Sequence, residues 1–126
     1  MRIILEDKKT FISVQQEFNK VFPYLKINFF LITGSIKVGN TTQKSLDKST
    51  KTLGEFRKSK SEKNIEITSD MTVAELETQM KNEYGILAQV HRNSGRMWLE
   101  TTLTDSWTLS EQNLQGESLN EKKTGC

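Results

Sequence analysis

The N-terminal part of the chain shows two different spacings of apolar positions. Residues 2–5 form a short apolar run that predicts a strand. Apolar side chains then recur every three or four positions over residues 11–21, which is the spacing of an amphipathic helix. Pro23 disfavours helical geometry at Phe22, so we expect the helix to end there. Residues 26–33 carry apolar side chains on both faces, which favours a central strand.

Residues 34–63 interrupt this pattern with a stretch rich in Lys, Ser, Thr and Gly. Loops this long without secondary structure are uncommon in compact domains and are often functional or disordered. We therefore expect a long, mobile loop here. Within it, Leu53 and Phe56 have the spacing to anchor a single helical turn.

The apolar pattern sharpens again after residue 63. Alternation over residues 65–68 predicts a half-buried strand. An apolar stripe over residues 73–84 predicts a second helix, and Gly85 follows it at the position of a left-handed C-cap. Residues 117–126 are polar and are expected to form a frayed tail.

Two five-residue segments carry the same signal for the start of a helix. Met71-Thr72-Val73-Ala74-Glu75 and Trp107-Thr108-Leu109-Ser110-Glu111 each place a threonine three residues before a glutamate, the spacing of a capping box. We interpret the likeness as a shared helix-starting device and not as a domain repeat. The second box predicts a short helix that ends at Gly116. For the first helix, both Thr10 and a capping box beginning at Ser13 are candidate starts.

Residues 86–92 and 96–103 predict a hairpin that turns at Asn93-Ser94-Gly95. Aligning the apolar faces of the two strands places Val90 opposite Leu99. The same register then places His91 opposite Trp98 on the polar face.

The order of elements predicts an α+β fold. We expect a mainly antiparallel sheet of four or five strands with two main helices on one face, plus a short C-terminal helix. The first six elements match the split βαβ order of ferredoxin-like folds. A β-grasp, ubiquitin-like arrangement is the alternative. Residues 1–116 would form one domain, with residues 117–126 as its tail.

Composition limits the chemistry available to the chain. It has 126 residues, a net charge of +2, one His and one Cys. One Cys allows no internal disulfide, and one His with one Cys does not supply a zinc site of the usual kind. The N-terminal apolar run is too short for a signal peptide, and no run reaches the ~20 residues that span a bilayer. We therefore expect a cytoplasmic location and no membrane partner.

The charge is unevenly distributed along the chain. Residues 37–63 sum to +5, which leaves −3 for the remainder. Clustered lysines can bind phosphates without reading bases, so an accessory nucleic-acid-binding protein is the alternative function. The candidate phosphate contacts are Lys44, Lys48, Lys51, Arg57, Lys58 and Lys60.

No catalytic motif stands out, and we expect no enzyme activity, no cofactor and no metal. The segment from Gly34 to Gly39 lacks the Lys-Ser/Thr pair of a phosphate-binding loop. Cys126 is the last residue and lacks a rigid setting for nucleophilic catalysis. The best general base would be His91 with Glu100 nearby, which is thin support for an enzyme.

The polar face of the predicted hairpin is the first candidate for a binding surface. An outward Trp flanked by Arg has the composition of a binding hot spot, for a protein partner or for self-association. The candidate residues are Leu87, Gln89, His91, Arg96, Trp98 and Glu100. The simpler expectation is that Trp107 and Leu114 fold back over Trp98 and cover this face.

Overall fold

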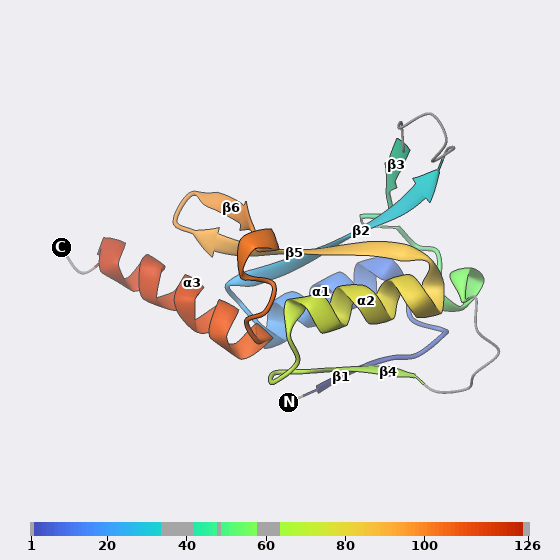
Figure 1. The fold of residues 1–126 in the computed structure, drawn as a ribbon, viewed down its shortest axis with the longest axis horizontal. Coiled ribbons are helices and arrows are strands. Elements are labelled where there is room, and N and C mark those ends of the chain that lie inside the picture. Colours follow the sequence, from blue (N-terminus) through green and yellow to red (C-terminus); the bar gives the residue numbers. More distant parts are fainter. Residues whose placement is uncertain (1, 34–41, 48, 58–63, 125–126) are drawn as a thin grey trace.

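A computed structural model describes residues 2–33, 42–47, 49–57 and 64–124 (Figure 1). The strands are β1 (Arg2–Leu5), β2 (Leu25–Thr33), β3 (Thr42–Ser45), β4 (Ile65–Thr68), β5 (Ile86–Ser94) and β6 (Met97–Glu100). The helices are α1 (Phe11–Val21), α2 (Val73–Tyr84) and α3 (Leu109–Thr124), with short 3-10 helices η2 (Leu53–Phe56) and η3 (Thr102–Thr104).

The strands form two separate antiparallel sheets. One has four strands in the order β3-β2-β5-β6, and the other is a two-stranded ribbon of β1 and β4. Figure 1 shows α1 and α2 between the four-stranded sheet and this ribbon. The α+β class and the antiparallel pairing are as predicted.

The expectation of a single sheet is wrong, and with it both the ferredoxin-like and the β-grasp arrangements. β1 and β4 pair with each other and with no strand of the larger sheet. Each alternates buried and outward residues, so the ribbon has one apolar face, which carries Ile3 and Ile67, and one polar face, where Arg2 contacts Glu66 at 3.6 Å. Such a ribbon can cover the sides of two helices that face away from the larger sheet. Packing against the larger sheet alone would leave those sides exposed.

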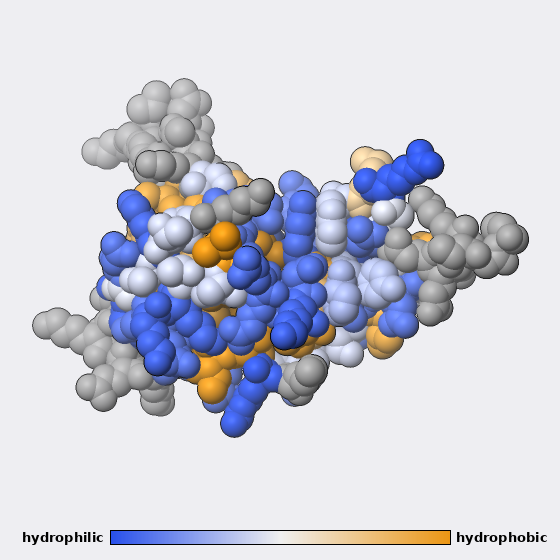
Figure 2. Space-filling model, turned by 180° about the vertical axis from the view of Figure 1, so that it is seen from behind, coloured by the Kyte–Doolittle hydropathy of each residue, from blue (hydrophilic) through white to orange (hydrophobic). Residues whose placement is uncertain are grey.

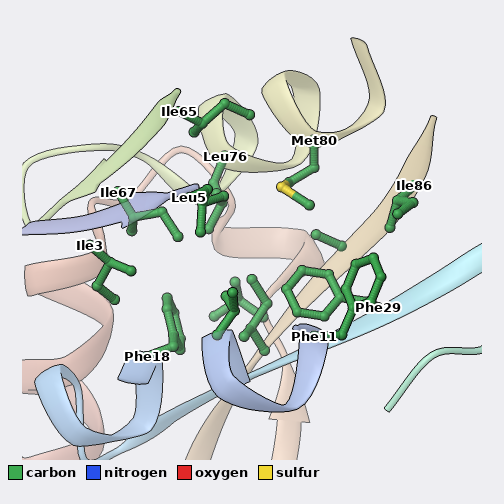
Figure 3. Packing of buried hydrophobic residues seen from close by; sticks show 14 of the residues in the cluster. Ile3, Leu5, Phe11, Phe18, Phe29, Ile65, Ile67, Leu76, Met80 and Ile86 are labelled. Atoms are coloured by element: carbon green, nitrogen blue, oxygen red, sulfur yellow. The ribbon is translucent and has the colours of Figure 1, made fainter. Parts of the chain in front are cut away.

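The hydrophobic core fills the space between the two sheets (Figure 3). The ring of Phe11 on α1 lies 5.3 Å from that of Phe29 on β2 and 5.5 Å from that of Phe56 on η2. Leu53 is fully buried, so the predicted helical turn at 53–56 does anchor its segment. Seen from behind, the surface is mainly polar, with apolar residues in separate areas (Figure 2).

The starts of α2 and α3 are joined to each other. Both predicted capping boxes are present, with Thr72 bonded to Glu75 and Thr108 to Glu111. The two threonines form an isolated antiparallel bridge, and four backbone bonds of 2.8–3.2 Å surround it. From donor N–H to acceptor C=O, these run Val73 to Trp107, Ala74 to Asp105, Leu109 to Met71 and Ser110 to Ser69. The two alike segments therefore bind each other reciprocally, which their similarity alone did not indicate.

The ends of the helices follow the predictions at α1 and α2 but not at α3. Thr10 is the N-cap of α1, which ends at Val21, and Gly85 caps α2 with a φ of 66°. Gly116 does not end α3, which continues to Thr124. A Cβ at Gly116 would lie 2.7 Å from the Cβ of Tyr24, so this glycine permits close packing of the helix against the start of β2.

The stretch 34–63 is more structured than a loop. It contributes β3 to the edge of the four-stranded sheet and η2 to the core. Residues 34–41, 48 and 58–63 lie outside the described residues, and the prediction of mobility there stays a prediction.

One part of the edge of β2 is closed by side chains. β3 pairs with residues 30–33, and no strand among the described residues pairs with residues 25–29 on that side. The N–H of Leu46 donates to Phe29 O at 2.8 Å, and side chains of α1 and of the turn after β3 satisfy other backbone groups there. The contacts are Asn19 Nδ2 to Leu25 O (2.8 Å), Gln15 Nε2 to Ile27 O (3.0 Å) and Phe29 N to Asp47 Oδ1 (3.2 Å). The amides and the carboxylate thus take the place of a neighbouring strand.

Candidate interaction surface

The hairpin of β5 and β6 turns through a two-residue loop. Ser94 pairs with Met97, which leaves Gly95 and Arg96 between them. Gly95 has a φ of 70°, a conformation that glycine adopts readily and that two-residue hairpin loops require. The predicted three-residue turn ending at Gly95 is therefore wrong, because the glycine begins the loop and does not close it.

The register consequently differs from the predicted one by two residues. His91 lies opposite Glu100 and not opposite Trp98, and the expected pair of Val90 with Leu99 is not formed. Side chains alternate with a period of two, so a shift of two residues keeps every side chain on its predicted face. The predicted partners are wrong, but the predicted faces are correct.

Five of the six candidate residues share one face of the four-stranded sheet. The exception is Arg96, which lies in the loop at the end of the hairpin. The three α-helices lie on the other side of the sheet, and no described helix covers this one (Figure 1). We call it the open face. It carries Leu87, Gln89, His91, Trp98 and Glu100, of which Glu100 is exposed and the others are partly exposed.

β2 adds residues that the sequence did not single out. Lys26, Asn28 and Phe30 pair with alternate residues of β5 and are partly exposed on the open face. The Nζ of Lys26 lies 4.9 Å from the centre of the Trp98 ring, a cation–π contact. The alternation of β2 was readable, but the pairing of β2 with β5, which brings Lys26 to this face, was not.

Trp107 and Leu114 do not cover Trp98. The guanidinium of Arg92 lies 5.6 Å from the centre of the Trp107 ring. Arg92 pairs with Leu99, so both belong to the face opposite that of Trp98. Leu114 is itself 59% exposed. The expectation that these residues would fold over Trp98 is therefore wrong.

Lys26, His91 and Glu100 form a row across three strands of the open face. Burial lowers the pKa of His91 below its usual value, and the charge of Lys26 lowers it further. Glu100 and Asp47 act in the opposite direction with smaller effect. The ring is therefore neutral at pH 7, and its buried Nδ1 has no hydrogen-bond partner among the described residues.

Arg57 is not available for phosphate. Its side chain is only 10% exposed, and its Nε donates to Asp7 Oδ1 at 2.8 Å while Nη1 lies 3.4 Å from Glu83 Oε2. The guanidinium also lies 5.3 Å from the centre of the Tyr84 ring. The interaction with Asp7 raises the pKa of Arg57 further. Arg57 thus links η2 to α2 and to the turn before α1, and its place among the phosphate contacts is a correction.

The other phosphate candidates are not brought together in the described part of the chain. Lys51 is exposed, with its Nζ 5.9 Å from the centre of the Phe56 ring. Lys44 lies in β3, on the edge of the four-stranded sheet. Lys48, Lys58 and Lys60 are outside the described residues, as are Cys126 and residues 34–39.

Lys26 and Asn28 extend the open face around the edge of β2. Both line a groove of about 400 Å³ that lies between α1 and β2. Gln15, Asn19 and Asp47 also line it, and each is already engaged in closing the edge of the strand. The groove therefore borders the open face, and the polar side chains of Gln15, Asn19 and Asp47 within it already have partners.

No helix among the described residues is long and apolar enough to span a membrane. The same residues contain no group of three or more His, Cys, Asp and Glu side chains arranged to hold a metal ion. Comparison of the chain with protein-family models, with curated proteins and with solved structures finds no match.

Proposed function

We propose that this chain is a non-catalytic protein-interaction module that binds a protein partner on the open face of its four-stranded sheet. The observation that supports the proposal is the cluster of aromatic and charged side chains on this face. Trp98 lies beneath Lys26, and Lys26 stands in a row with His91 and Glu100. We propose a cytoplasmic location for this activity.

The chemistry of the open face is that of a protein-binding surface. Binding hot spots are enriched in Trp, which contributes a large contact area at low entropic cost. The amides of Asn28 and Gln89 are partly exposed donors and acceptors for a partner's backbone, and Phe30 and Leu87 add apolar area beside them. One cation and one anion in the same row favour a partner of mixed charge.

Site-specific photo-crosslinking in cells tests the proposal. A photoreactive residue replaces Gln89 at the centre of the open face, and in a second variant it replaces Thr78, which is exposed on α2. We expect the Gln89 position to give a discrete adduct with another protein and the Thr78 position to give none. Equal adducts at both positions, or none at either, would contradict the proposal.

A matched pair of tryptophan variants makes the test specific. Trp98→Ala, introduced together with the crosslinker at Gln89, removes the centre of the proposed site, and we expect the adduct to be lost. Trp107→Ala removes a partly exposed Trp from the opposite face, where it also contacts a cation. We expect the adduct to persist in this control, with both variants keeping the far-UV circular dichroism of the parent.

Nucleic-acid binding is the alternative function, and it rests on the charge of residues 37–63. It predicts a gel shift at low salt that weakens steeply as salt is added and that is lost when Lys58 and Lys60 are replaced by Ala. With Arg57 held in ion pairs, the described contacts do not favour it.

A further inference from the structure

β6 is an outer strand of the four-stranded sheet. Edge strands of monomeric proteins are commonly protected by short length, charged side chains, Pro, a bulge or a covering element, and of these β6 has its length of four residues and the charge of Glu100. β6 has the sequence Met-Trp-Leu-Glu, and no described strand pairs with its outer side. Met97 and Leu99 are 64% and 37% exposed. An edge with exposed apolar side chains and no strand paired to it among the described residues is available for pairing with another strand.

The hairpin geometry identifies which backbone groups face outward. Ser94 and Met97 close the two-residue loop, and Thr101 donates its N–H to the carbonyl of Val90. Odd-numbered residues of β6 therefore direct their backbone groups toward β5, and even-numbered residues direct theirs outward. Outward N–H and C=O groups belong to Trp98 and Glu100, and no described residue bonds them.

The same molecule treats a second open edge differently. Along residues 25–29 of β2, the side chains of Gln15, Asn19 and Asp47 occupy the edge and satisfy its backbone groups. β6 has no such closure among the described residues. The backbone groups along the edge of β6 therefore remain available for a further strand.

We propose that β6 pairs in antiparallel fashion with β6 of a second copy of this chain. With Trp98 opposite Trp98 of the second copy, the hairpin loop that carries Arg96 comes beside Glu100 of the other chain. Met97 then comes opposite Leu99 on the reverse side. Arg96 and Glu100 are both exposed, and neither forms an ion pair with any described residue. The edge is therefore complementary to itself in charge, in apolar contact and in hydrogen bonding, as a two-fold interface requires.

The next register compatible with the outward groups is less favourable. It places Leu99 opposite Leu99 and Trp98 opposite Glu100. The loop with Arg96 then lies beside Thr102, which has no carboxylate to pair with the guanidinium. The charges thus select the register centred on Trp98. The pairing goes beyond the proposed function because it uses the backbone groups along the edge of β6, although the side chains of Trp98 and Glu100 also belong to the open face.

Charge reversal with rescue tests the proposed pairing. Sedimentation velocity over a range of concentrations should show the wild-type chain shifting from 14.5 kDa to twice that mass. Arg96→Glu places like charges beside each other twice in the dimer, and we expect about a tenfold weaker association. Arg96→Glu combined with Glu100→Arg restores opposite charges, and we expect the wild-type affinity to return. A chain that stays monomeric up to solubility, or a dimer indifferent to both variants, would overturn the proposal.

Amide hydrogen exchange separates edge pairing from any other dimer. The N–H groups of Met97 and Leu99 face β5 and should exchange slowly at every concentration. Those of Trp98 and Glu100 face outward and should become protected only as the dimer forms. Protection that does not change with concentration at these two amides, in a chain that does dimerise, would overturn the edge as the interface. Loss of the photo-crosslinked partner at Gln89 would not affect this result, so the two proposals fail separately.

Discussion

The sheet that β2 and β5 form has two faces with different surroundings. Phe29 is fully buried against the helices, whereas Phe30, the next residue, is partly exposed on the open face. Ala88 and Gln89 show the same contrast on β5. One face contributes its apolar area to the free energy of folding, and the other keeps a mixed set of groups in contact with water.

This difference separates residues that hold the fold from residues that are free to bind. Buried side chains already make their packing contacts and hydrogen bonds within the fold. Partly exposed side chains retain surface area that a partner can bury. Matched substitutions on the two faces should therefore separate stability from binding. The predictions below test that separation.

Phenylalanines adjacent in sequence should give the largest contrast. Phe29→Ala removes a buried ring that packs against Phe11, and we expect a loss of about 3–5 kcal/mol in the free energy of unfolding. Phe30→Ala removes a partly exposed ring and should cost about 1 kcal/mol or less. Urea unfolding of both variants measures the difference. Similar losses would mean that the open face is covered after all.

Two glutamines give a smaller contrast of the same kind. Gln112 is fully buried; its Nε2 donates to Thr104 O at 2.7 Å, and its Oε1 accepts from Arg92 Nη1, also at 2.7 Å. Gln112→Ala leaves those partners unsatisfied, and we expect a loss of about 1–3 kcal/mol. Gln89→Ala on the open face should stay within about 0.5 kcal/mol of wild type. Denaturant midpoints at constant slope report both values, and a reversed order would contradict the assignment of faces.

The pH dependence of stability should show the smallest effect. The pKa of His91 is lowered in the folded chain, so the unfolded chain binds a proton more readily. The stability associated with the neutral ring is complete above about pH 6.5 and is lost as the pH falls below it. His91→Gln should remove this part of the pH dependence. Thermal unfolding of both proteins between about pH 7.5 and pH 5.5 tests it, and parallel pH profiles would exclude the role of His91.

How well each feature of the fold could be predicted depended on how far apart in sequence the interacting residues are. Capping boxes, the left-handed Gly85 and the alternation in β5 depend on neighbours in sequence, and they were predicted correctly. The pairing of β1 with β4 brings residues 2–5 beside residues 65–68, and no local pattern specifies it. The α+β class was therefore predicted correctly, whereas β3, the length of α3 and the number of sheets were not.

The candidate surface shows the same limit. The side chains of β5 and β6 were placed on the correct face because side chains alternate every two residues, and the register error was also two residues. Lys26 was missed because it reaches Trp98 only through the pairing of β2 with β5. Arg57 was misassigned because its charge is visible in the sequence, but its partners Asp7 and Glu83 are not.

The paired starts of α2 and α3 have an electrostatic consequence. Each helix N-terminus carries a partial positive charge, and the four reciprocal backbone bonds bring two such ends together. Their mutual repulsion is offset by the carboxylates of Glu75 and Glu111, one in each capping box. Hydrogen bonds from Thr108 lower the pKa of Glu111, so the counter-charge at the start of α3 persists to a lower pH than that of an ordinary glutamate. Protonation of Glu111 in acid therefore removes a counter-charge at a point where the positive ends of two helices meet.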